Sequence, residues 1–370
     1  MKIIINTIPL LKPATGVGYY IYNLCREFLR LSPSEFSFTF YYGWFSRKLY
    51  TPPDQFFSTK FFLLKPFKAL LRRIFHFTSS FFSSSFDLYF EPNFIPLSFK
   101  PRWTVVTIHD FSFIRYPYWH PKERIAYFSN YFFKNIYKAD VIITPSRFIA
   151  EEVKEFIPNF TGKVVPISLA CDTSVFHPQA ALGFEKFFSS FPKKYLLFTG
   201  TLEPRKNLST LFQAYSLLPD NFKKEYPLVI VGADGWKNSS IKEQLRNLIN
   251  KGEAIYLGYV PVKLLAALYA KAYCLVYPSF YEGFGLPPLE AMSCGCPVIV
   301  SRIASLPEVC GDAALYVDPT QVEDLASALL KILSSVEFRN SLASKAFSRA
   351  SLFSWENTAK KHLSLFSQLS

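Results

Sequence analysis

Short runs of aliphatic residues alternate along the chain with segments of helical periodicity, and this alternation limits the fold more than any other feature. The runs are rich in Val, Ile and Leu and lack the strict polar alternation of a half-exposed strand, which is typical of parallel strands buried on both faces. We expect nine such strands, at residues 2–8, 103–108, 140–144, 163–167, 195–199, 227–232, 254–258, 273–277 and 297–300.

The segments between these runs repeat apolar residues at helical spacing. Residues 17–31 carry Leu24 and Phe28 on one face, and Asn207 is expected to cap a second helix over 207–218. Strands and helices that alternate in two series predict an α/β protein with two doubly wound, Rossmann-like lobes and a cleft between them.

The length of 370 residues exceeds the comfortable size of one hydrophobic core and suits two domains. The strand pattern is lost around residues 173–192, so we expect an N-terminal domain over 1–175 and a second domain over 176–353. A final helix over 354–370 is expected to pack back toward the first domain.

Composition excludes several classes of protein. Half of the residues are hydrophobic and 19% are charged, so a disordered chain is excluded. No apolar run approaches the roughly 20 residues of a membrane-spanning helix, and the first residues lack a signal-peptide pattern, so we expect a cytoplasmic protein. The six cysteines are irregularly spaced and the five histidines form no cluster, so we expect reduced thiols and no metal site.

A net charge of +13 leaves nucleic acid, anionic lipid and phosphorylated small molecules open as partners. Residues 61–77 form a basic amphipathic pattern when a helix is started at Pro66. Such a helix packs in the core with a solvated basic face, or it docks into the surface of an anionic membrane. We favour peripheral membrane contact and expect no binding of nucleic acid.

The stretch YEGFGLPPLEAMSCGCPV, residues 281–298, has the composition of a phosphate-binding turn. It follows a predicted strand, and its prolines are suited to the first turn of a helix. The backbone N–H groups just ahead of that helix belong to Gly283, Phe284, Gly285 and Leu286. With the helix dipole they are expected to bind a diphosphate.

Two carboxylates, Glu282 and Glu290, flank this turn. Carboxylates repel phosphate but accept strong hydrogen bonds from hydroxyl groups, so polyols are expected on both sides of the diphosphate. A nucleotide-sugar has this composition. The alternative is that Glu290 only complements the helix N-terminus and that Glu282 is solvated.

Several motifs resemble those of the retaining GT-B glycosyltransferases of family 4. EGFGLPPLEAMSCGCPVIVS looks like the E-x7-E signature of this family, and FTGTLEPRKNLSTLFQAY at 198–215 resembles its second motif. PEVCGDAALYVDP, TIHDFSFIRYP and ITPSRF also follow the pattern of the family. The likeness runs over most of residues 1–330 and is specific from 195 to 320.

The resemblance implies roles for individual residues. Glu282 would bind hydroxyls of the donor sugar and Glu290 those of the ribose, while Arg205 and Lys206 would hold the diphosphate in place of a metal ion. His109 would contact the donor sugar near the reacting centre. Structural roles remain the alternative for each of them.

The resemblance also implies further substrate contacts. Gly16 and Gly18 would lie near the diphosphate and the acceptor, although the family often has a glycine where this chain has Thr15. Gly258 and Tyr259 would lie near the nucleobase.

The resulting hypothesis is a metal-independent, retaining hexosyltransferase without a resident cofactor. It would move a hexose from a nucleotide-sugar to a glycan or lipid-linked acceptor of cell-surface polysaccharide or lipopolysaccharide. Resemblance to bacterial mannosyltransferases favours GDP-mannose as the donor. A UDP-hexose-dependent glucosyl- or galactosyltransferase, an epimerase or phosphorylase, and an inactive nucleotide-sugar-binding scaffold remain as alternatives.

Overall fold

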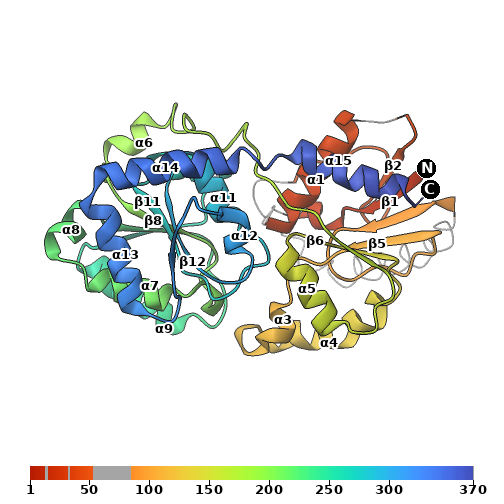
Figure 1. Ribbon diagram of the computed structural model, residues 1–370, viewed down its shortest axis with the longest axis horizontal. Helices are drawn as coiled ribbons and strands as arrows, with labels where there is room; N and C mark the ends of the chain where they lie inside the picture. The colour runs from red at the N-terminus through yellow and green to blue at the C-terminus, as the bar shows by residue number, and fades with distance from the viewer. Residues whose placement is uncertain (13–15, 32–33, 53–84, 370) are drawn as a thin grey trace, which may run out of the picture. The chain divides into compact units, whose positions relative to one another are not determined.

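The computed structural model of the protein describes residues 1–12, 16–31, 34–52 and 85–369 (Figure 1). The predicted basic amphipathic segment 61–77 and Thr15 lie outside the described residues. Contacts divide the chain into two compact units, each with its own sheet. Unit 1 comprises residues 1–111, 126–169 and 355–370, and unit 2 comprises 112–125 and 170–354.

The sheet of unit 1 has the strand order β3-β2-β1-β4-β5-β6-β7 among the described residues. Every neighbouring pair is parallel except β2 and β3. The strands are β1 (Lys2–Asn6), β2 (Ser37–Tyr41), β3 (Phe45–Ser46), β4 (Leu88–Glu91), β5 (Trp103–Thr107), β6 (Val141–Thr144) and β7 (Lys163–Pro166). The helices are η1 (Ile8–Leu11), α1 (Gly16–Leu31), α4 (Lys122–Ile136), which begins in unit 2, α5 (Arg147–Phe156) and α15 (Trp355–Ser367).

The sheet of unit 2 is entirely parallel, with the order β10-β9-β8-β11-β12-β13. Its strands are β8 (Leu196–Thr199), β9 (Leu228–Val231), β10 (Ala254–Gly258), β11 (Cys274–Tyr277), β12 (Val298–Ser301) and β13 (Leu315–Val317). The first helices are α3 (Ser112–Arg115), η4 (Pro117–Trp119), α6 (Glu185–Ser189), η5 (Pro204–Lys206), α7 (Leu208–Ser216), α8 (Asp220–Glu225) and α9 (Ser239–Asn250). The later ones are α10 (Val262–Lys271), α11 (Leu286–Ser293), α12 (Leu306–Cys310), α13 (Val322–Ser334) and α14 (Val336–Ala350).

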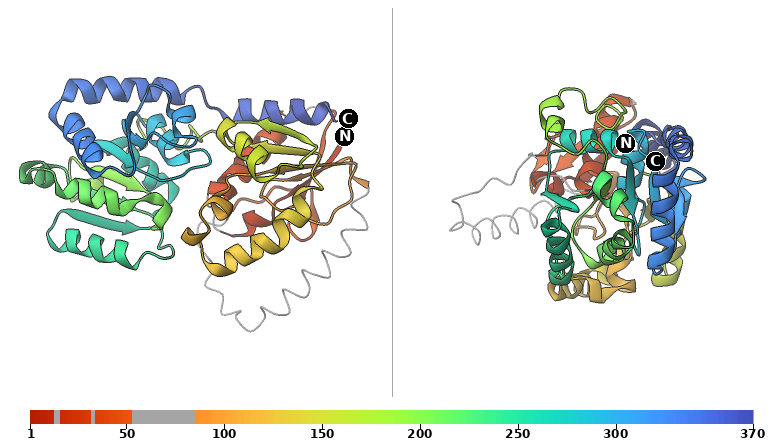
Figure 2. Two further views of the ribbon diagram at one scale, coloured as in Figure 1. Left: turned by 60° about the horizontal axis from the view of Figure 1, so that its bottom comes forward. Right: turned by 90° about the vertical axis from the view of Figure 1, so that its left-hand side faces the viewer.

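The helices of unit 2 lie on both faces of its sheet, as right-handed crossovers require. Helix α7 contacts α9 and α13 on one face, and α11 contacts α10 and α14 on the other (Figures 1 and 2). The central strands are consequently buried along their whole length, which explains their aliphatic composition. The prediction of two doubly wound α/β lobes is confirmed.

All nine predicted strands are present, each shifted by at most two residues at an end. Strands β2, β3, β4 and β13 were not predicted. They are short and contain Phe or Tyr, with sequences SFTFY, FS, LYFE and LYV, so they lack the aliphatic run that marks the others.

The observed units differ from the expected division at residue 175. Residues 112–125 belong to unit 2, and unit 1 ends its central stretch at Leu169. The physical reason lies in two hydrogen bonds: Trp236 Nε1 donates to the Trp119 carbonyl at 2.6 Å, and Lys237 Nζ donates to that of Tyr118. These bonds hold the segment against unit 2.

The C-terminal helix α15 belongs to unit 1, where it packs beside α1 (Figures 1 and 2). Phe366 contacts the rings of Phe28 and Phe90, with centroids 5.9 and 5.6 Å away. The side chain of Thr358 also donates a hydrogen bond to the Ser168 carbonyl at 2.9 Å. Among the described helices, none combines the length and apolar composition needed to span a bilayer.

Candidate functional site

The candidate site lies at the carboxyl-terminal edge of the sheet in unit 2, between β8 and β11. These strands are neighbours in the sheet, although residues 200–273 separate them along the chain. The chain continues from β8 outward to β9 on one side and from β11 outward to β12 on the other. Ligands of open α/β sheets bind at such a switch in strand order.

The loop after β8 approaches its neighbour closely. A Cβ atom at Gly232 would lie 1.9 Å from the carbonyl oxygen of Gly200, so the absence of a side chain at Gly232 allows the loops after β8 and β9 to touch. The loop then enters η5, which carries Arg205 and Lys206. Both cations are therefore carried at the edge of the sheet by a closely packed loop.

Asn207 is the N-cap residue of α7, as predicted, but its side chain does not cap the helix. Its backbone is left-handed, with φ of 57°, and its side chain makes no cap hydrogen bond. The side-chain amide instead donates to the carbonyls of Pro278 and Pro319, at 3.0 and 2.7 Å. Asn207 is thus the N-cap by position, while its side chain ties three loops of the site together.

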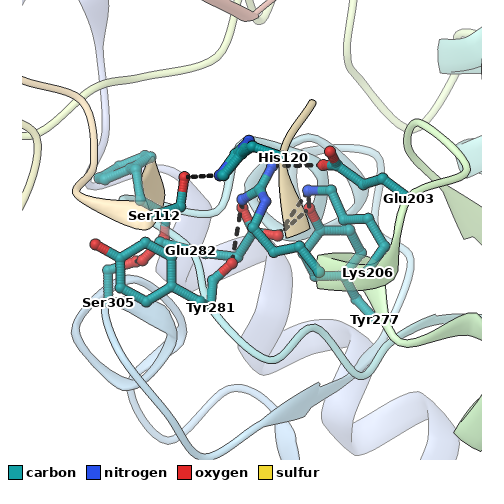
Figure 3. Close-up of polar contacts among 10 residues, drawn as sticks. Ser112, His120, Glu203, Lys206, Tyr277, Tyr281, Glu282 and Ser305 are labelled. Atoms are coloured by element: carbon teal, nitrogen blue, oxygen red, sulfur yellow. Dashed lines mark hydrogen bonds and ion pairs between the residues drawn. The ribbon is translucent and has the colours of Figure 1, made fainter. Parts of the chain in front are cut away.

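Glu282 lies in direct contact with both predicted cations, and Figure 3 shows it beside Lys206. Its carboxylate accepts from Lys206 Nζ at 2.6 Å and from Arg205 at 3.0 Å. Arg205 also donates to Glu203 at 2.9 Å, and Tyr277 donates to Glu282 at 2.9 Å. The result is a buried network of two carboxylates, two cations and a phenol.

The network keeps Glu282 ionised. Burial opposes its negative charge, but the charges of Arg205 and Lys206 outweigh burial and lower the pKa of Glu282 to about 2. Burial, together with the charge of Arg205, lowers the pKa of Lys206 from its ordinary value. The positive charges at the site are therefore matched by carboxylates that hold them in place.

The turn after Glu282 is held by Ser305. The Ser305 hydroxyl lies 2.8 Å from the Glu282 carbonyl and 2.7 Å from that of Phe284. Gly285 precedes α11 with φ of 117°, and Pro287 and Pro288 lie in its first turn, as predicted. The turn residues Gly283, Phe284 and Gly285 thus lie directly at the N-terminus of a helix, which begins at Leu286.

Glu290 has different partners from those of Glu282. It is half-buried on α11 and accepts from the Tyr269 hydroxyl at 3.1 Å, and that hydroxyl is 2.7 Å from Thr199 Oγ1. Burial raises the pKa of Glu290 to about 7, and the Tyr269 hydrogen bond offsets only part of this effect. Unlike Glu282, Glu290 is close to its titration point at neutral pH.

Gly258 is the last residue of β10, and Tyr259 follows it at the same edge of the sheet. Gly258 has φ of 65°, and the Tyr259 side chain is 55% exposed. This position leaves an aromatic side chain accessible at the end of the strand.

The remaining predicted residues belong to unit 1. Gly16 and Gly18 form the first turn of α1. His109 follows β5; its Nε2–H donates to the Pro92 carbonyl at 2.8 Å, and the ring of Tyr20 lies edge-on at 5.1 Å. Burial lowers the pKa of His109, so its imidazole is neutral at physiological pH.

Sequence reasoning missed two residues of the network, Glu203 and Tyr277, and also Ser305, which holds the adjoining turn. Glu203 lies two positions before Arg205, and Tyr277 ends a predicted strand, so their places in the motif could have drawn notice. No sequence signal links Ser305 to this turn. Sequence reasoning also missed Glu91 in unit 1. Its buried carboxyl accepts a hydrogen bond from Asn6 at 2.7 Å, and burial raises the pKa of Glu91 to about 8.

Within the described residues, no three His, Cys, Asp or Glu side chains gather in a way that could hold a metal ion. The six cysteines are buried free thiols. The network itself supplies two cations and two carboxylates, and carboxylates accept hydrogen bonds from hydroxyl groups.

Two Rossmann-like units with a cationic, acid-flanked site at the strand-order switch define the class of GT-B glycosyltransferases. Consistent with this class, residues 14–175 match the model of "Glycosyltransferase Family 4" and residues 184–349 that of "Glycosyl transferases group 1". The chain belongs to this glycosyltransferase family and is a glycosyltransferase.

The chain is 37% identical to O-antigen chain mannosyltransferase B of Escherichia coli over 284 residues, covering 76% of this chain and 74% of that protein. Among solved structures, sucrose-phosphate synthase of Thermosynechococcus elongatus aligns with a TM-score of 0.73 at 20% identity, over 100% of this chain and 99% of that chain. Anabaena Alr3699/HepE in complex with UDP-glucose aligns with a TM-score of 0.69 at 16% identity, over the whole of both chains. The two structures support the fold.

Proposed function

We propose that this glycosyltransferase moves a mannosyl group from a nucleoside-diphosphate mannose to a growing glycan or lipid-linked acceptor of a cell-surface polysaccharide or lipopolysaccharide. GDP-mannose is the preferred donor. The single observation that carries the proposal is the network of Arg205, Lys206 and Glu282 at the strand-order switch, in a chain 37% identical to an O-antigen mannosyltransferase.

In this proposal Arg205 and Lys206 bind the diphosphate, whose negative charge grows as the glycosidic bond breaks. The turn of Gly283, Phe284, Gly285 and Leu286 adds backbone N–H groups and the dipole of α11. The ion pairs with Glu203 and Glu282 hold the two cations in position before the donor arrives, which reduces the cost of reorganisation. Transfer then needs no divalent metal, so an excess of EDTA should leave the rate unchanged.

The carboxylates take the hydroxyl groups of the donor. Glu282 accepts from the sugar and Glu290 from the ribose. Tyr259 and Gly258 lie beside the nucleobase, and the base is read mainly by backbone groups.

Substrate contacts are also proposed for His109, Gly16 and Gly18. Because the Nε2–H of the neutral His109 imidazole donates to the Pro92 carbonyl, Nδ1 is the nitrogen that accepts one hydrogen bond from a hydroxyl of the donor sugar, without adding charge at the reacting centre. The glycines leave room at the first turn of α1 for the donor diphosphate or the acceptor.

The reaction is proposed to retain the anomeric configuration. The bond between the anomeric carbon and the diphosphate oxygen breaks, and the acceptor oxygen bonds to the same face of that carbon. The acceptor proton passes to the leaving diphosphate oxygen, so no side chain has to act as a nucleophile. NMR of the product anomer tests this step, because an inverted linkage contradicts it.

The donor is tested with a panel of GDP-mannose, GDP-glucose, UDP-glucose, UDP-galactose and ADP-glucose. We expect a thermal shift and turnover with GDP-mannose above all, since a ligand that binds the folded protein raises its stability. Turnover confined to a UDP-hexose would replace the mannosyl assignment with a UDP-sugar transferase. Binding without hydrolysis or transfer would indicate an inactive scaffold.

We also propose that residues 61–77 make peripheral contact with an anionic membrane at its cytoplasmic face. The support is the sequence pattern alone, with Lys65, Lys68 and Arg72 opposite a broad apolar face. The full chain should co-sediment with phosphatidylglycerol vesicles, and replacement of the three cations by glutamate should abolish this. Equal sedimentation of both proteins would contradict the proposal.

A further inference from the structure

A cavity lies at the carboxyl-terminal edge of the same sheet, in unit 2. It has a volume of about 820 Å³. The loops after β12 and β13 form one wall, and residues of the segment 112–125 form the other. Its lining includes five aromatic and three charged residues: Tyr116, Tyr118, Trp119, Phe280, Tyr316, Arg302, Asp318 and Asp324. None of these residues has a role in the donor site described above.

The aromatic wall is held in place by contacts within unit 2. The Trp119 ring stacks on Tyr116 at 4.0 Å and lies near-parallel to Phe280 at 5.9 Å. The backbone carbonyls of Trp119 and Tyr118 accept hydrogen bonds from Trp236 and Lys237. The Tyr118 side chain itself is 63% exposed, so a large aromatic surface is presented to a ligand from a fixed backbone.

The cavity is joined to the candidate donor site through one loop. Phe280 lies two residues before Glu282, and its backbone N–H donates to the Arg205 carbonyl at 2.9 Å. A ligand that contacts Phe280 therefore lies on the same loop that carries the donor-binding carboxylate.

The charges of the lining favour a neutral, hydroxyl-rich ligand. Asp318 and Asp324 provide two carboxylates against the single guanidinium of Arg302, which lies 4.7 Å from the ring centre of Tyr316. This balance disfavours a phosphate or a diphosphate, whereas carboxylates and Arg both bond to hydroxyl groups. Aromatic faces cover the apolar C–H face of a sugar ring, so the lining combines both kinds of contact that a pyranose offers.

We propose that this cavity binds internal sugar units of the acceptor glycan, a chain of neutral hexopyranoses, while its end is extended at the donor site. The assignment rests on the proposed function, since it takes a growing mannose-containing glycan as the acceptor. A volume of about 820 Å³ exceeds the needs of one hexose and accommodates a short oligosaccharide. The enzyme then prefers long acceptors over short ones.

The test compares Tyr118→Ala and Arg302→Ala with the wild type and with Phe347→Ala. Both cavity residues have exposed side chains, so the substitutions leave the fold intact. Phe347 is an exposed aromatic residue on α14 outside the cavity, which makes it a matched control. Initial rates are measured with GDP-mannose and a ladder of α-linked mannose oligosaccharides from the monosaccharide to the hexasaccharide.

Each cavity variant should raise the acceptor KM for the hexasaccharide about tenfold, the size of one lost aromatic or charged contact. The KM for the monosaccharide, the KM for GDP-mannose and the rate of donor hydrolysis should match those of the wild type and of Phe347→Ala. The inference would be overturned if the cavity variants had the same acceptor KM as the wild type for every oligosaccharide of the ladder. A raised KM for GDP-mannose would also overturn it, because the cavity would then serve the donor.

Direct binding separates this inference from the proposed function. Titration of the hexasaccharide, followed by Trp fluorescence and by ligand NMR, should saturate with the wild type and weaken about tenfold in both cavity variants. This result supports the cavity even if GDP-mannose is not the donor. Saturation that is identical in wild type and variants would overturn the cavity while leaving mannosyl transfer standing.

Discussion

At the scale of single residues, the two acids of the E-x7-E stretch differ in charge state because their neighbours differ. Glu282 is surrounded by Arg205 and Lys206, whose charges hold it ionised. Glu290 has a phenol as its partner and no cation within salt-bridge distance among the described residues. A diphosphate near these acids therefore meets one carboxylate that is already neutralised and another that is readily protonated.

Glu282→Gln should lower both stability and activity. The pKa of Glu282 in the folded protein, about 2, is below its ordinary value of 4.5. Ionised Glu282 therefore stabilises the fold at neutral pH, and this contribution is lost as the pH falls from about 4.5 toward 2. We expect the free energy of unfolding of the variant to be about 3 kcal/mol below that of the wild type at pH 7, and the difference to shrink below pH 4.5. Urea unfolding at a series of pH values measures it.

The control for this variant is Glu225→Gln. Glu225 and Lys194 form an ion pair in which both side chains are 49% exposed, so solvent screens it and its loss should change stability far less than Glu282→Gln does. Activity separates the two roles of Glu282. Transfer should fall by at least about a hundredfold, because the neutral amide forms no ion pair with Arg205 or Lys206 and accepts weaker hydrogen bonds than the carboxylate does. A stable, fully active Glu282→Gln enzyme would refute the assignment.

Glu290→Gln should change the pH dependence in the opposite sense. The pKa of Glu290 is raised by burial to about 7, so the neutral acid stabilises the fold at low pH and this contribution is lost as the pH rises from about 4.5 through 7. Because the amide cannot ionise, the free energy of unfolding of the variant should exceed that of the wild type by up to about 3 kcal/mol at pH 8. Thermal unfolding between pH 5 and 8 measures the trend.

Glu290→Gln also tests contact with the ribose. An amide oxygen is a weaker acceptor than a carboxylate, so the donor KM at pH 8 should rise about tenfold. Glu323→Gln, at an exposed position of α13, should leave both the pH trend and the donor KM unchanged. An unaltered donor KM in Glu290→Gln would remove this residue from the donor site.

The sequence motifs singled out candidate site residues but did not reveal their partners. Glu282, Arg205 and Lys206 were each identified from a motif, whereas the ion pairs between them join residues 76 and 77 positions apart. Those pairs depend on β8 and β11 being neighbours, and sequence periodicity reveals a strand without its place in the sheet. For the same reason the supporting role of Ser305 was not foreseen.

At the scale of elements, prediction succeeded where a strand consists of aliphatic residues and failed where aromatic residues fill the core. Residues Tyr89 and Phe90 of β4 are fully buried, as are Phe40 and Tyr41 of β2. Because these large rings fill the core in place of aliphatic side chains, no extended Val, Ile or Leu run marks the two strands in the sequence. Helix limits were predicted closely because α1 and α7 follow the usual apolar spacing.

The start of α11 offers a prediction at this scale. Gly285 has φ of 117°, and a Cβ atom there would lie 2.8 Å from Leu306 Cδ2. Gly285→Ala should therefore destabilise the protein by about 1–3 kcal/mol and displace the turn that carries Phe284. Donor affinity, measured by calorimetric titration with GDP, should fall together with stability.

Gly252→Ala provides the matched control. Gly252 also has a positive φ, of 72°, but no atom lies within 4 Å of the place that an added Cβ atom would occupy. We expect a cost of about 1 kcal/mol from backbone conformation and no change in donor affinity. A Gly285→Ala enzyme that binds GDP as the wild type does would show that this turn is not part of the donor site.

At the scale of the whole molecule, each unit owes part of its core to a distant stretch of sequence. Helix α15 closes the core of unit 1, where Phe366 is fully buried against Phe28 and Phe90. Unit 2 in turn includes residues 112–125, which come from the first half of the chain. The stability of a unit can therefore be altered from a segment that sequence position would assign elsewhere.

Phe366→Ala should destabilise unit 1 by about 3–5 kcal/mol, the usual cost of removing a buried phenylalanine side chain. Amide hydrogen exchange should show the loss of protection in β1, β4 and α1. Leu329→Ala, at a fully buried position of α13, should shift protection in unit 2 instead. Loss of protection in the sheet of unit 2 on replacing Phe366 would contradict the assignment of α15 to unit 1.

The interleaved course of the chain limits how the protein can be recombined with its relatives. A chimaera joined once, near residue 175, would combine a foreign unit 2 with this chain's Tyr116 and Trp119, and would supply α15 from the wrong parent. A graft that keeps both cores native must also exchange 112–125 and retain 355–370. Swapping donor specificity between members of this family is thus a problem of several splice points rather than one.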